Sequence, residues 1–277
     1  MPRLYRHMNI TNDNYYSPEA ENAYLTNSQR KTFMECPARW MAKLTGEWVD
    51  PPRKTFLMAQ YIDTAITEPA KFQDFLIRHA DDIYKYGKQE KGKKADWAEL
   101  DKAIAALKSE PVVMQYLTGD AQALFAIDDF HGVPYKGKLD VLAPGKCITD
   151  LKTCRSVYET LYSPEHKERV SFIDFYGYWT QLALYREAVR IQTDEELPCF
   201  IVALEKTEPY DRKLFHLDDV DYLEREVQAA IEIFTAMQRH KEAGDTPDDL
   251  PRCERCHYCV STKTIFGPES IKPRIRF

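Results

Sequence analysis

Two aspartates and a lysine lie around one short turn in the middle of the chain, within the stretch YKGKLDVLAPGKCITDLKTCR at 135–155. Asp150 and Lys152 are two residues apart on a predicted strand, so their side chains leave the same face of it. Asp140 ends the preceding predicted strand and can approach them across the sheet. Because neighbouring carboxylates repel, this arrangement is favourable when a cation neutralises it, and such oxygen ligands suit Mg²⁺ or Mn²⁺.

Lys152 gives this group a means of catalysing hydrolysis. A lysine beside the metal can orient or deprotonate an attacking water, and it can stabilise the charge that grows on a phosphate in the transition state. Asp140, Asp150 and Lys152 are therefore a competent set for phosphodiester hydrolysis. A D-x-K pair on a strand is common, however, and a solvated β-hairpin is the simpler explanation of the set taken alone.

A second polar pair lies further along the chain, in FYGYWTQLALYREAV. Gln181 and Tyr185 are four residues apart, which places them on one face of a predicted helix. The structural alternative is a helix that simply packs through Trp179, Leu182 and Tyr185.

Cysteines form a third group of residues with chemical potential. The chain has seven, and three of them cluster as C-x₂-C-x₂-C at Cys253, Cys256 and Cys259. An odd number with the others scattered does not indicate a disulfide framework, and in a reducing compartment this spacing indicates metal. The remaining cysteines at 147, 154 and 199 are expected to be small core residues.

The composition is that of a globular protein able to bury a substantial core. The chain has 277 residues, 44% hydrophobic and 30% charged, with a formal net charge of −6. No apolar run is long enough to span a bilayer, and the polar N-terminus lacks the apolar centre of a signal peptide, so we expect a cytoplasmic protein without membrane contact. The negative charge disfavours a protein that coats nucleic acid, but it is compatible with an enzyme that concentrates basic residues along one groove.

The elements that must position these residues form one α/β domain with a helical N-terminal part. After a break at Pro51-Pro52, the stretch 54–67 is predicted to be a helix, and it carries Asp63 among apolar neighbours. The expected divisions are an irregular arm over 1–24, a helical part over 25–118, a catalytic core over 119–243, and a cysteine cluster with tail over 244–277.

The core pattern alternates strands with helices. Between 121 and 153, β-branched alternation and two turn signals predict three consecutive antiparallel strands. The remaining predictions are a helix over 173–191, strands over 199–205 and 213–217, and a charged helix over 218–242.

In this order, the polar residues match three motifs of a known superfamily. Gly137-Lys138-Leu139-Asp140, Asp150-Leu151-Lys152 and Gln181-x-x-x-Tyr185 resemble the G-x-x-D, D-x-K and Q-x-x-x-Y motifs of the RecB-like branch of PD-(D/E)XK nucleases. Within that branch the chain is similar to phage-type, RecE-like exodeoxyribonucleases. Its opening NITNDNYYSPEAENAYLTNSQRKTFMECPARWMAKLTGEW and its ending RCERCHYCVSTKTIFGP also look like theirs, so the resemblance covers nearly the whole chain.

The resemblance implies a fold and an activity. The fold is a central mixed sheet flanked by helices, and the activity is Mg²⁺-dependent hydrolysis with Asp140 and Asp150 as metal ligands and Lys152 beside the attacking water. Gln181 and Tyr185 would support the site or contact the DNA. Relatives digest double-stranded DNA from its 5′ ends and leave 3′ single strands for a RecT-like annealing protein. A ring-shaped homo-oligomer and a phage or prophage origin in a bacterial host are expected on the same ground.

One departure concerns the metal ligands. Many RecB-like nucleases place a histidine on an N-terminal helix, where this chain offers Asp63. An aspartate can also ligate a hard cation, so Asp63 is a candidate third ligand, with a helix-surface carboxylate as the alternative. Whether an upstream acid such as Asp120 reaches the site stays open at this point.

The resemblance also joins Cys36 to the three C-terminal cysteines. Some RecB-like nucleases hold an iron–sulfur cluster with one N-terminal and three C-terminal cysteines, and Cys36, Cys253, Cys256 and Cys259 look similar, although the last spacing is shorter. A [4Fe-4S] cluster or structural Zn²⁺ would join the chain ends, with His257 as a spare ligand. Three reduced cysteines without metal are the alternative.

Three other functions compete with an exonuclease. A RecB-like endonuclease or a CRISPR-adaptation nuclease also fits the cysteine set. A non-catalytic DNA-binding protein or a zinc-stabilised interaction domain would leave the complete motif series unexplained. The basic stretches Lys88–Lys94 and Lys272–Arg276 are candidate DNA contacts, although solvated surface is the simpler interpretation of both.

Overall fold

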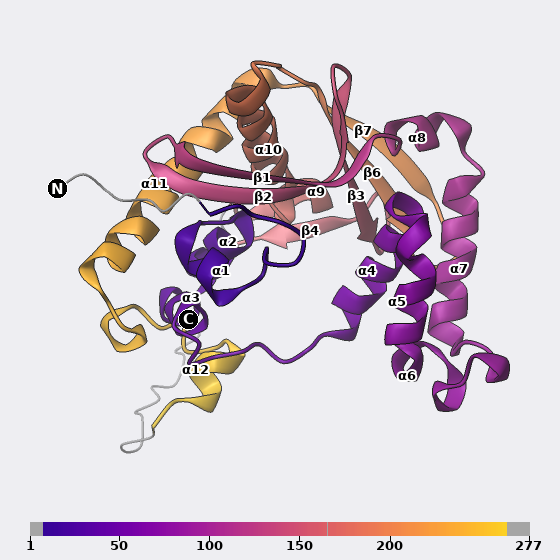
Figure 1. Cartoon of the computed structure of the whole chain (residues 1–277), viewed down its shortest axis with the longest axis horizontal. Helices are drawn as coiled ribbons and strands as arrows, with labels where there is room; N and C mark the ends of the chain where they lie inside the picture. Colours follow the sequence, from indigo (N-terminus) through magenta and orange to yellow (C-terminus); the bar gives the residue numbers. More distant parts are fainter. Residues whose placement is uncertain (1–7, 165, 265–277) are drawn as a thin grey trace, which may run out of the picture.

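A five-stranded mixed sheet lies at the centre of the computed structural model, which describes residues 8–164 and 166–264 (Figure 1). Its strands follow the order β1-β2-β3-β6-β7, in which β3 and β6 are parallel and the other neighbours antiparallel. The bounds are Asp120–Phe130 (β1), Val133–Ala143 (β2), Cys147–Cys154 (β3), Cys199–Glu205 (β6) and Arg212–Leu217 (β7). The predicted series of three antiparallel strands is confirmed.

Strand β6 shows how the core is divided. Ile201 and Ala203 belong to one buried hydrophobic cluster, whereas Val202 and Leu204 belong to another. Because successive side chains of a strand point to opposite faces, the sheet is covered by protein on both sides at this strand.

Helices cover the two faces. One cluster joins the sheet to α2, α3, α10 and α11, and the other joins it to α4 and α7. Figure 1 shows α4 to α8 grouped at one end of the molecule and α1 to α3 with α12 at the other. The bounds are Pro18–Ala23 (α1), Asn27–Glu35 (α2), Pro37–Leu44 (α3), Lys54–Thr67 (α4), Phe72–Arg78 (α5), Ala80–Ile83 (α6), Ala95–Lys108 (α7), Pro111–Tyr116 (α8), Phe172–Phe175 (α9), Tyr178–Thr193 (α10), Val220–Ala243 (α11) and His257–Ser261 (α12). The predicted α/β class, a mixed sheet flanked by helices, is confirmed.

Two predicted helices are each broken into two. The helix expected to start near residue 25 divides at Cys36, because Pro37 lacks an amide hydrogen and disfavours helical geometry in the residue before it. Thr26 caps α2 by accepting a hydrogen bond from Gln29 N–H. The helix expected over 173–191 divides between α9 and α10 at Gly177, whose φ of 62° lies in the left-handed region.

The segment 1–24, expected to be an irregular arm, contains helix α1. Ser17 caps this helix and Pro18 occupies its first turn, both of which favour helix initiation. The segment is anchored by Lys136 of β2, a fully buried lysine whose ammonium donates to Tyr15 O and lies 2.9 Å from Glu21 Oε1. Residues 15–24 of this segment therefore pack against the sheet as part of the fold.

A second, two-stranded sheet was not predicted. It pairs Thr160–Ser163 (β4) with Glu168–Ser171 (β5) and leads directly into α9. Its strands are short and mostly exposed, so the hydrophobic alternation that identifies longer strands is missing. Over the described residues, no helix has both the length and the apolar character needed to cross a membrane.

Candidate active site

Strands β2 and β3 bring Asp140 and Asp150 together. Their pairing ends at Val141 and Thr149, and the two aspartates are the next residue on each strand. The Asp140 carboxylate turns toward β3, where Oδ2 accepts a hydrogen bond from Leu151 N–H at 2.9 Å. The two acids therefore lie beside the point where the strands cease to pair.

Lys152 forms an ion pair with Asp150, whose side chain is 1% exposed. The lysine ammonium also lies 4.9 Å from the centre of the Tyr178 ring. Burial by itself would lower the pKa of Lys152, but the carboxylates of Asp150 and Asp140 outweigh it and raise that pKa. Lys152 is therefore held as a cation at neutral pH.

Gln181 and Tyr185 meet this group from α10. Gln181 Nε2 donates to Asp150 Oδ1 at 3.3 Å and to Tyr185 Oη at 3.0 Å. The spacing of four residues places both side chains on the helix face that looks onto β3. The Gln181 amide thus links α10 to the Asp150 carboxylate.

Asp63 approaches the same region from α4. Burial is the main cause that raises the pKa of Asp63 to about 7, and the charge of Asp150 adds to it against the opposing effect of Lys152. Burial, followed by the charges of Asp150 and Asp63, also raises the pKa of Asp140 well above its ordinary value. Asp63 and Asp140 therefore both resist ionisation, chiefly because their carboxylates are withdrawn from water.

The three carboxylates are less tightly gathered than the cysteines. In the part of the chain described, the only group of three or more histidine, cysteine, aspartate or glutamate ligand atoms within 4.8 Å of one another is the four-cysteine cluster. Mutual repulsion and the position of Lys152 beside Asp150 account for this looser arrangement. The donor set nevertheless fits a hard divalent cation, because it offers oxygens alone and an excess of negative charge.

The site opens into a cleft of about 680 Å³. Asp63, Asp140 and Tyr185 line it, together with the cationic side chains of Lys43, Arg78 and Lys138 and the exposed ring of Tyr16. Glu21 and Glu68 line it as well, so the cleft combines acids with basic side chains that could hold a polyanion close to a metal site.

Gln122 is a residue at the site that was not predicted. It lies on β1 with φ of 52°, a left-handed conformation that is unusual for a non-glycine residue in a strand. Its side-chain amide lies 3.5 Å from Asp140 Oδ1. Asp120 is exposed at the start of β1, and Gln122 is the β1 residue that reaches Asp140. The sequence gives no local signal for that backbone conformation.

Two lysines of the basic stretch Lys88–Lys94 are engaged in the fold, whereas Lys88 and Lys91 are exposed. Lys93 Nζ donates to both carboxylate oxygens of Asp101 and to Tyr61 Oη, and Lys94 Nζ donates to Asp81 O. These contacts favour a structural role. The second basic stretch, Lys272–Arg276, lies outside the described residues.

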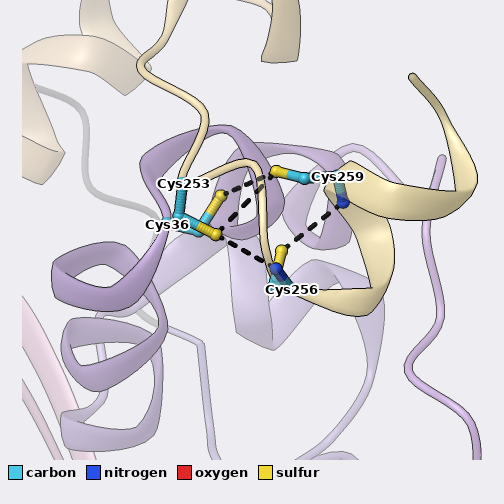
Figure 2. A group of neighbouring side chains, drawn as sticks. All are labelled: Cys36, Cys253, Cys256 and Cys259. Atoms are coloured by element: carbon cyan, nitrogen blue, oxygen red, sulfur yellow. Dashed lines mark hydrogen bonds between the residues drawn. The ribbon is translucent and has the colours of Figure 1, made fainter. Parts of the chain in front are cut away.

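The four cysteines named for a metal site do come together (Figure 2). Cys36 Sγ lies 3.5 Å from Cys259 Sγ, and Cys253 Sγ lies 3.9 Å from Cys259 Sγ. The cluster joins the α2–α3 junction to the segment that leads into α12. His257 contacts the ring of Trp48 at 5.3 Å between ring centres. The other cysteines, at 147, 154 and 199, are buried as expected.

The thiols also have the acid–base properties of a ligand set. Burial alone would raise the pKa of Cys253, but hydrogen bonds from the backbone N–H groups of Arg255 and Cys256 lower this pKa to about 6. Burial is the main cause that raises the pKa of Cys256 to about 12. One thiolate is thus stabilised next to thiols that need a cation to ionise, which fits Zn²⁺ or an iron–sulfur cluster.

Comparisons with known proteins agree on the fold. A family model described as a PDDEXK-like domain of unknown function (DUF3799) matches residues 26–262. A crystal structure from Eubacterium rectale, described as a "putative exonuclease", is 28% identical in sequence with a TM-score of 0.85, over 95% of this chain and 97% of that one. No curated protein matches the sequence.

Proposed function

The chain belongs to the family of PDDEXK-like domains, and on that premise we propose that it is an Mg²⁺-dependent exodeoxyribonuclease. It would digest linear double-stranded DNA from its ends, in the 5′ to 3′ direction, and leave 3′ single strands for recombination by annealing. The family and the neighbouring structure, itself described as a "putative exonuclease", both support a nuclease. The polarity and the biological role rest on the resemblance of the motifs.

The observation that carries this proposal is the convergence of Asp140, Asp150 and Lys152 beside one cleft, which Asp140 lines. Asp140 comes from β2, Asp150 and Lys152 from β3, and Gln181 from α10 donates to Asp150. A solvated hairpin would leave such side chains in water, whereas the Asp150 carboxylate is 1% exposed. Burial of a carboxylate pair is costly unless it serves a bound cation.

Each residue has a distinct part in the proposed reaction. Asp140, Asp150 and Asp63 would hold Mg²⁺ or Mn²⁺. When bound, such an ion polarises the scissile phosphate and favours formation of a nucleophilic hydroxide. Lys152, held as a cation, would stabilise negative charge on the phosphate and orient the attacking water. Gln181 and Tyr185 would hold the Asp150 carboxylate in position and contact the bound DNA strand.

The test is Mg²⁺-dependent digestion of 5′-end-labelled linear duplex, with closed circular plasmid of the same sequence in parallel. We expect loss of the linear substrate alone and a fall of at least about a hundredfold with Lys152→Ala, since one transition-state contact of this kind is worth that much. Lys146→Ala, which changes an exposed lysine at the β2–β3 turn, is the matched control and should cleave normally. No cleavage by the wild-type protein with Mg²⁺ or Mn²⁺ would exclude the proposal.

An endonuclease of the RecB-like or CRISPR-adaptation type is the second candidate. The specific observation in its favour is the cluster of Cys36, Cys253, Cys256 and Cys259, because comparable cysteine sets accompany such enzymes. Cleavage of the closed circle would decide for this candidate.

The partners in this proposal are the ends of double-stranded DNA, a RecT-like annealing protein and further copies of the chain in a ring. These follow from the resemblance to RecE-like nucleases. Co-purification with a single-strand annealing protein and light scattering of the purified chain would test them separately from the chemistry.

A further inference from the structure

Two exposed aromatic side chains stand next to each other at the turn between α9 and α10. Phe175 is 41% exposed and Tyr176 is 46% exposed, and their ring centres are 5.1 Å apart. The hydrophobic core includes their neighbours Phe172, Ile173 and Tyr178 but neither of these two rings. The rings of Phe175 and Tyr176 therefore do not contribute to the packing of the core among the described residues.

A continuous series of ring contacts leads from these two residues to the candidate active site. The rings of Tyr176 and Tyr178 are 5.8 Å apart, and Tyr178 faces the ammonium of Lys152 at 4.9 Å. Since Lys152 forms an ion pair with Asp150, the exposed ring of Tyr176 is connected to that carboxylate through Tyr178 and Lys152, in three contacts. We call Phe175, Tyr176 and Tyr178 the aromatic track.

Lys31 of α2 adds a second cation and fixes the track in place. Its ammonium donates to Tyr176 O at 2.7 Å and lies 5.5 Å from the centre of the Tyr178 ring. On the other side, Ser171 caps α9, and Gly177 begins α10 in the left-handed conformation. The rings are thus presented by a turn held at both ends, which lowers the entropy lost when a ligand stacks on them.

We propose that the aromatic track binds unpaired nucleotides of a single DNA strand beside the catalytic site, so that the preferred ligand of this surface is single-stranded DNA. Exposed rings interleaved with lysines are the combination that holds single strands, because every base offers a face for stacking and every phosphate a negative charge. The inference rests on the proposed nuclease function. It specifies that the surface next to the reacting phosphate binds DNA in its single-stranded form.

Paired DNA and a peptide are poorer occupants of this surface. In a duplex the base faces are already stacked on one another, so rings such as Phe175 and Tyr176 can reach only the last base of an end. A hydrophobic peptide would gain nothing from Lys31 and Lys152, whose charges complement phosphates. An unpaired strand uses both features at once.

The test measures binding without cleavage. Full-length protein in EDTA is titrated into a fluorescent 15-nucleotide single strand that carries 2-aminopurine, and into the corresponding blunt duplex. We expect Tyr176→Ala to weaken single-strand binding about tenfold, with loss of the 2-aminopurine quenching, and to change duplex binding less than about twofold. Tyr176→Trp keeps a ring and should retain both affinity and quenching.

Tyr86→Ala is the matched control, because Tyr86 is 88% exposed but lies outside the track. Unchanged single-strand affinity in Tyr176→Ala and in Phe175→Ala would overturn the inference and indicate a protein contact at these rings. Wild-type protein that fails to bind the single strand would overturn it as well. Cleavage by the wild type is scored separately with Mg²⁺, so that a binding protein without nuclease activity would contradict the proposed function and leave this inference intact.

Discussion

At the residue scale, the proposed chemistry of this molecule depends on carboxylates that are buried close to one another. The pKa of Asp63 is raised to about 7 and that of Asp140 is also raised, chiefly through burial. In the unfolded chain both acids would titrate near the ordinary value of 3.8. Without metal, the protonated forms of these acids therefore contribute fully to the free energy of unfolding only at acidic pH. This contribution is lost as pH rises through about 7, the pKa of Asp63 in the folded protein.

This difference predicts a pH-dependent response to divalent metal. In EDTA the melting temperature should fall between pH 5.5 and pH 8, because ionisation of Asp63 and Asp140 buries charge and adds repulsion with Asp150. Each pKa unit corresponds to about 1.4 kcal/mol, so the loss should amount to a few kcal/mol. Mg²⁺ should restore stability at pH 8 and have little effect at pH 5.5, since the protonated acids bind it poorly. Thermal melts at both pH values, with and without Mg²⁺, measure this.

Asp63→Asn separates this effect from other titrations in the chain. The amide cannot ionise, so the pH slope in EDTA should become shallower and the Mg²⁺-induced shift smaller. Asp120→Asn, at an exposed position on β1, should behave as wild type. An unchanged slope in Asp63→Asn would show that Asp63 does not cause the pH dependence, and an unchanged Mg²⁺-induced shift would show that it does not bind the metal.

At the element scale, Gly137 determines how closely β1 and β2 pack beneath the site. It pairs with Phe125, and a Cβ atom at position 137 would lie 2.1 Å from Cζ of that ring. The same ring lies edge-on to Tyr185 of α10, with 6.1 Å between ring centres. The glycine of the G-x-x-D motif therefore makes room for a ring that positions the Q-x-x-x-Y helix.

Gly137→Ala should accordingly destabilise the fold by about 3 kcal/mol, the upper range for inserting a methyl group into a packed interior. Chemical denaturation measures the loss. The double variant Gly137→Ala with Phe125→Leu should recover part of it, because the shorter side chain leaves space for the new methyl group. Strict additivity of the two single changes would contradict this account.

Elements with a local signal could be predicted from the sequence, and those set by tertiary contacts could not. Helix α4 was predicted with its bounds, and the strands β1 to β3 followed from alternation and turn residues. The motif residues Asp140, Asp150 and Gln181 could be named because each belongs to a short motif that is visible in the local sequence. The position of Gln122 depends on an unusual φ, and the hairpin β4–β5 has no hydrophobic pattern. Neither feature could therefore be predicted from the sequence.

At the scale of the whole molecule, the cysteine cluster joins segments that are far apart in the chain. Cys36 ends α2, and Cys259 lies in α12, yet their sulfur atoms are 3.5 Å apart. Since α2 and α3 contribute residues to one wall of the cleft, this junction also holds that wall against the rest of the protein. A metal bound here would contribute to folding rather than to phosphodiester chemistry.

Loss of such a metal should lower stability and leave the carboxylates of the proposed active site intact. We expect protein purified without oxygen to contain iron or zinc, and Cys256→Ser to lose it, because an alcohol is a poor ligand for either. The melting temperature should fall by at least about 5 °C, since a structural metal contributes directly to the free energy of folding. Elemental analysis and absorption spectra distinguish iron–sulfur from zinc. Cys147→Ala, at a buried cysteine outside the cluster, should keep its full metal content. Wild-type protein that is metal-free and equally stable with and without chelator would mean that the thiols remain reduced side chains, and the wall would then be held by packing alone.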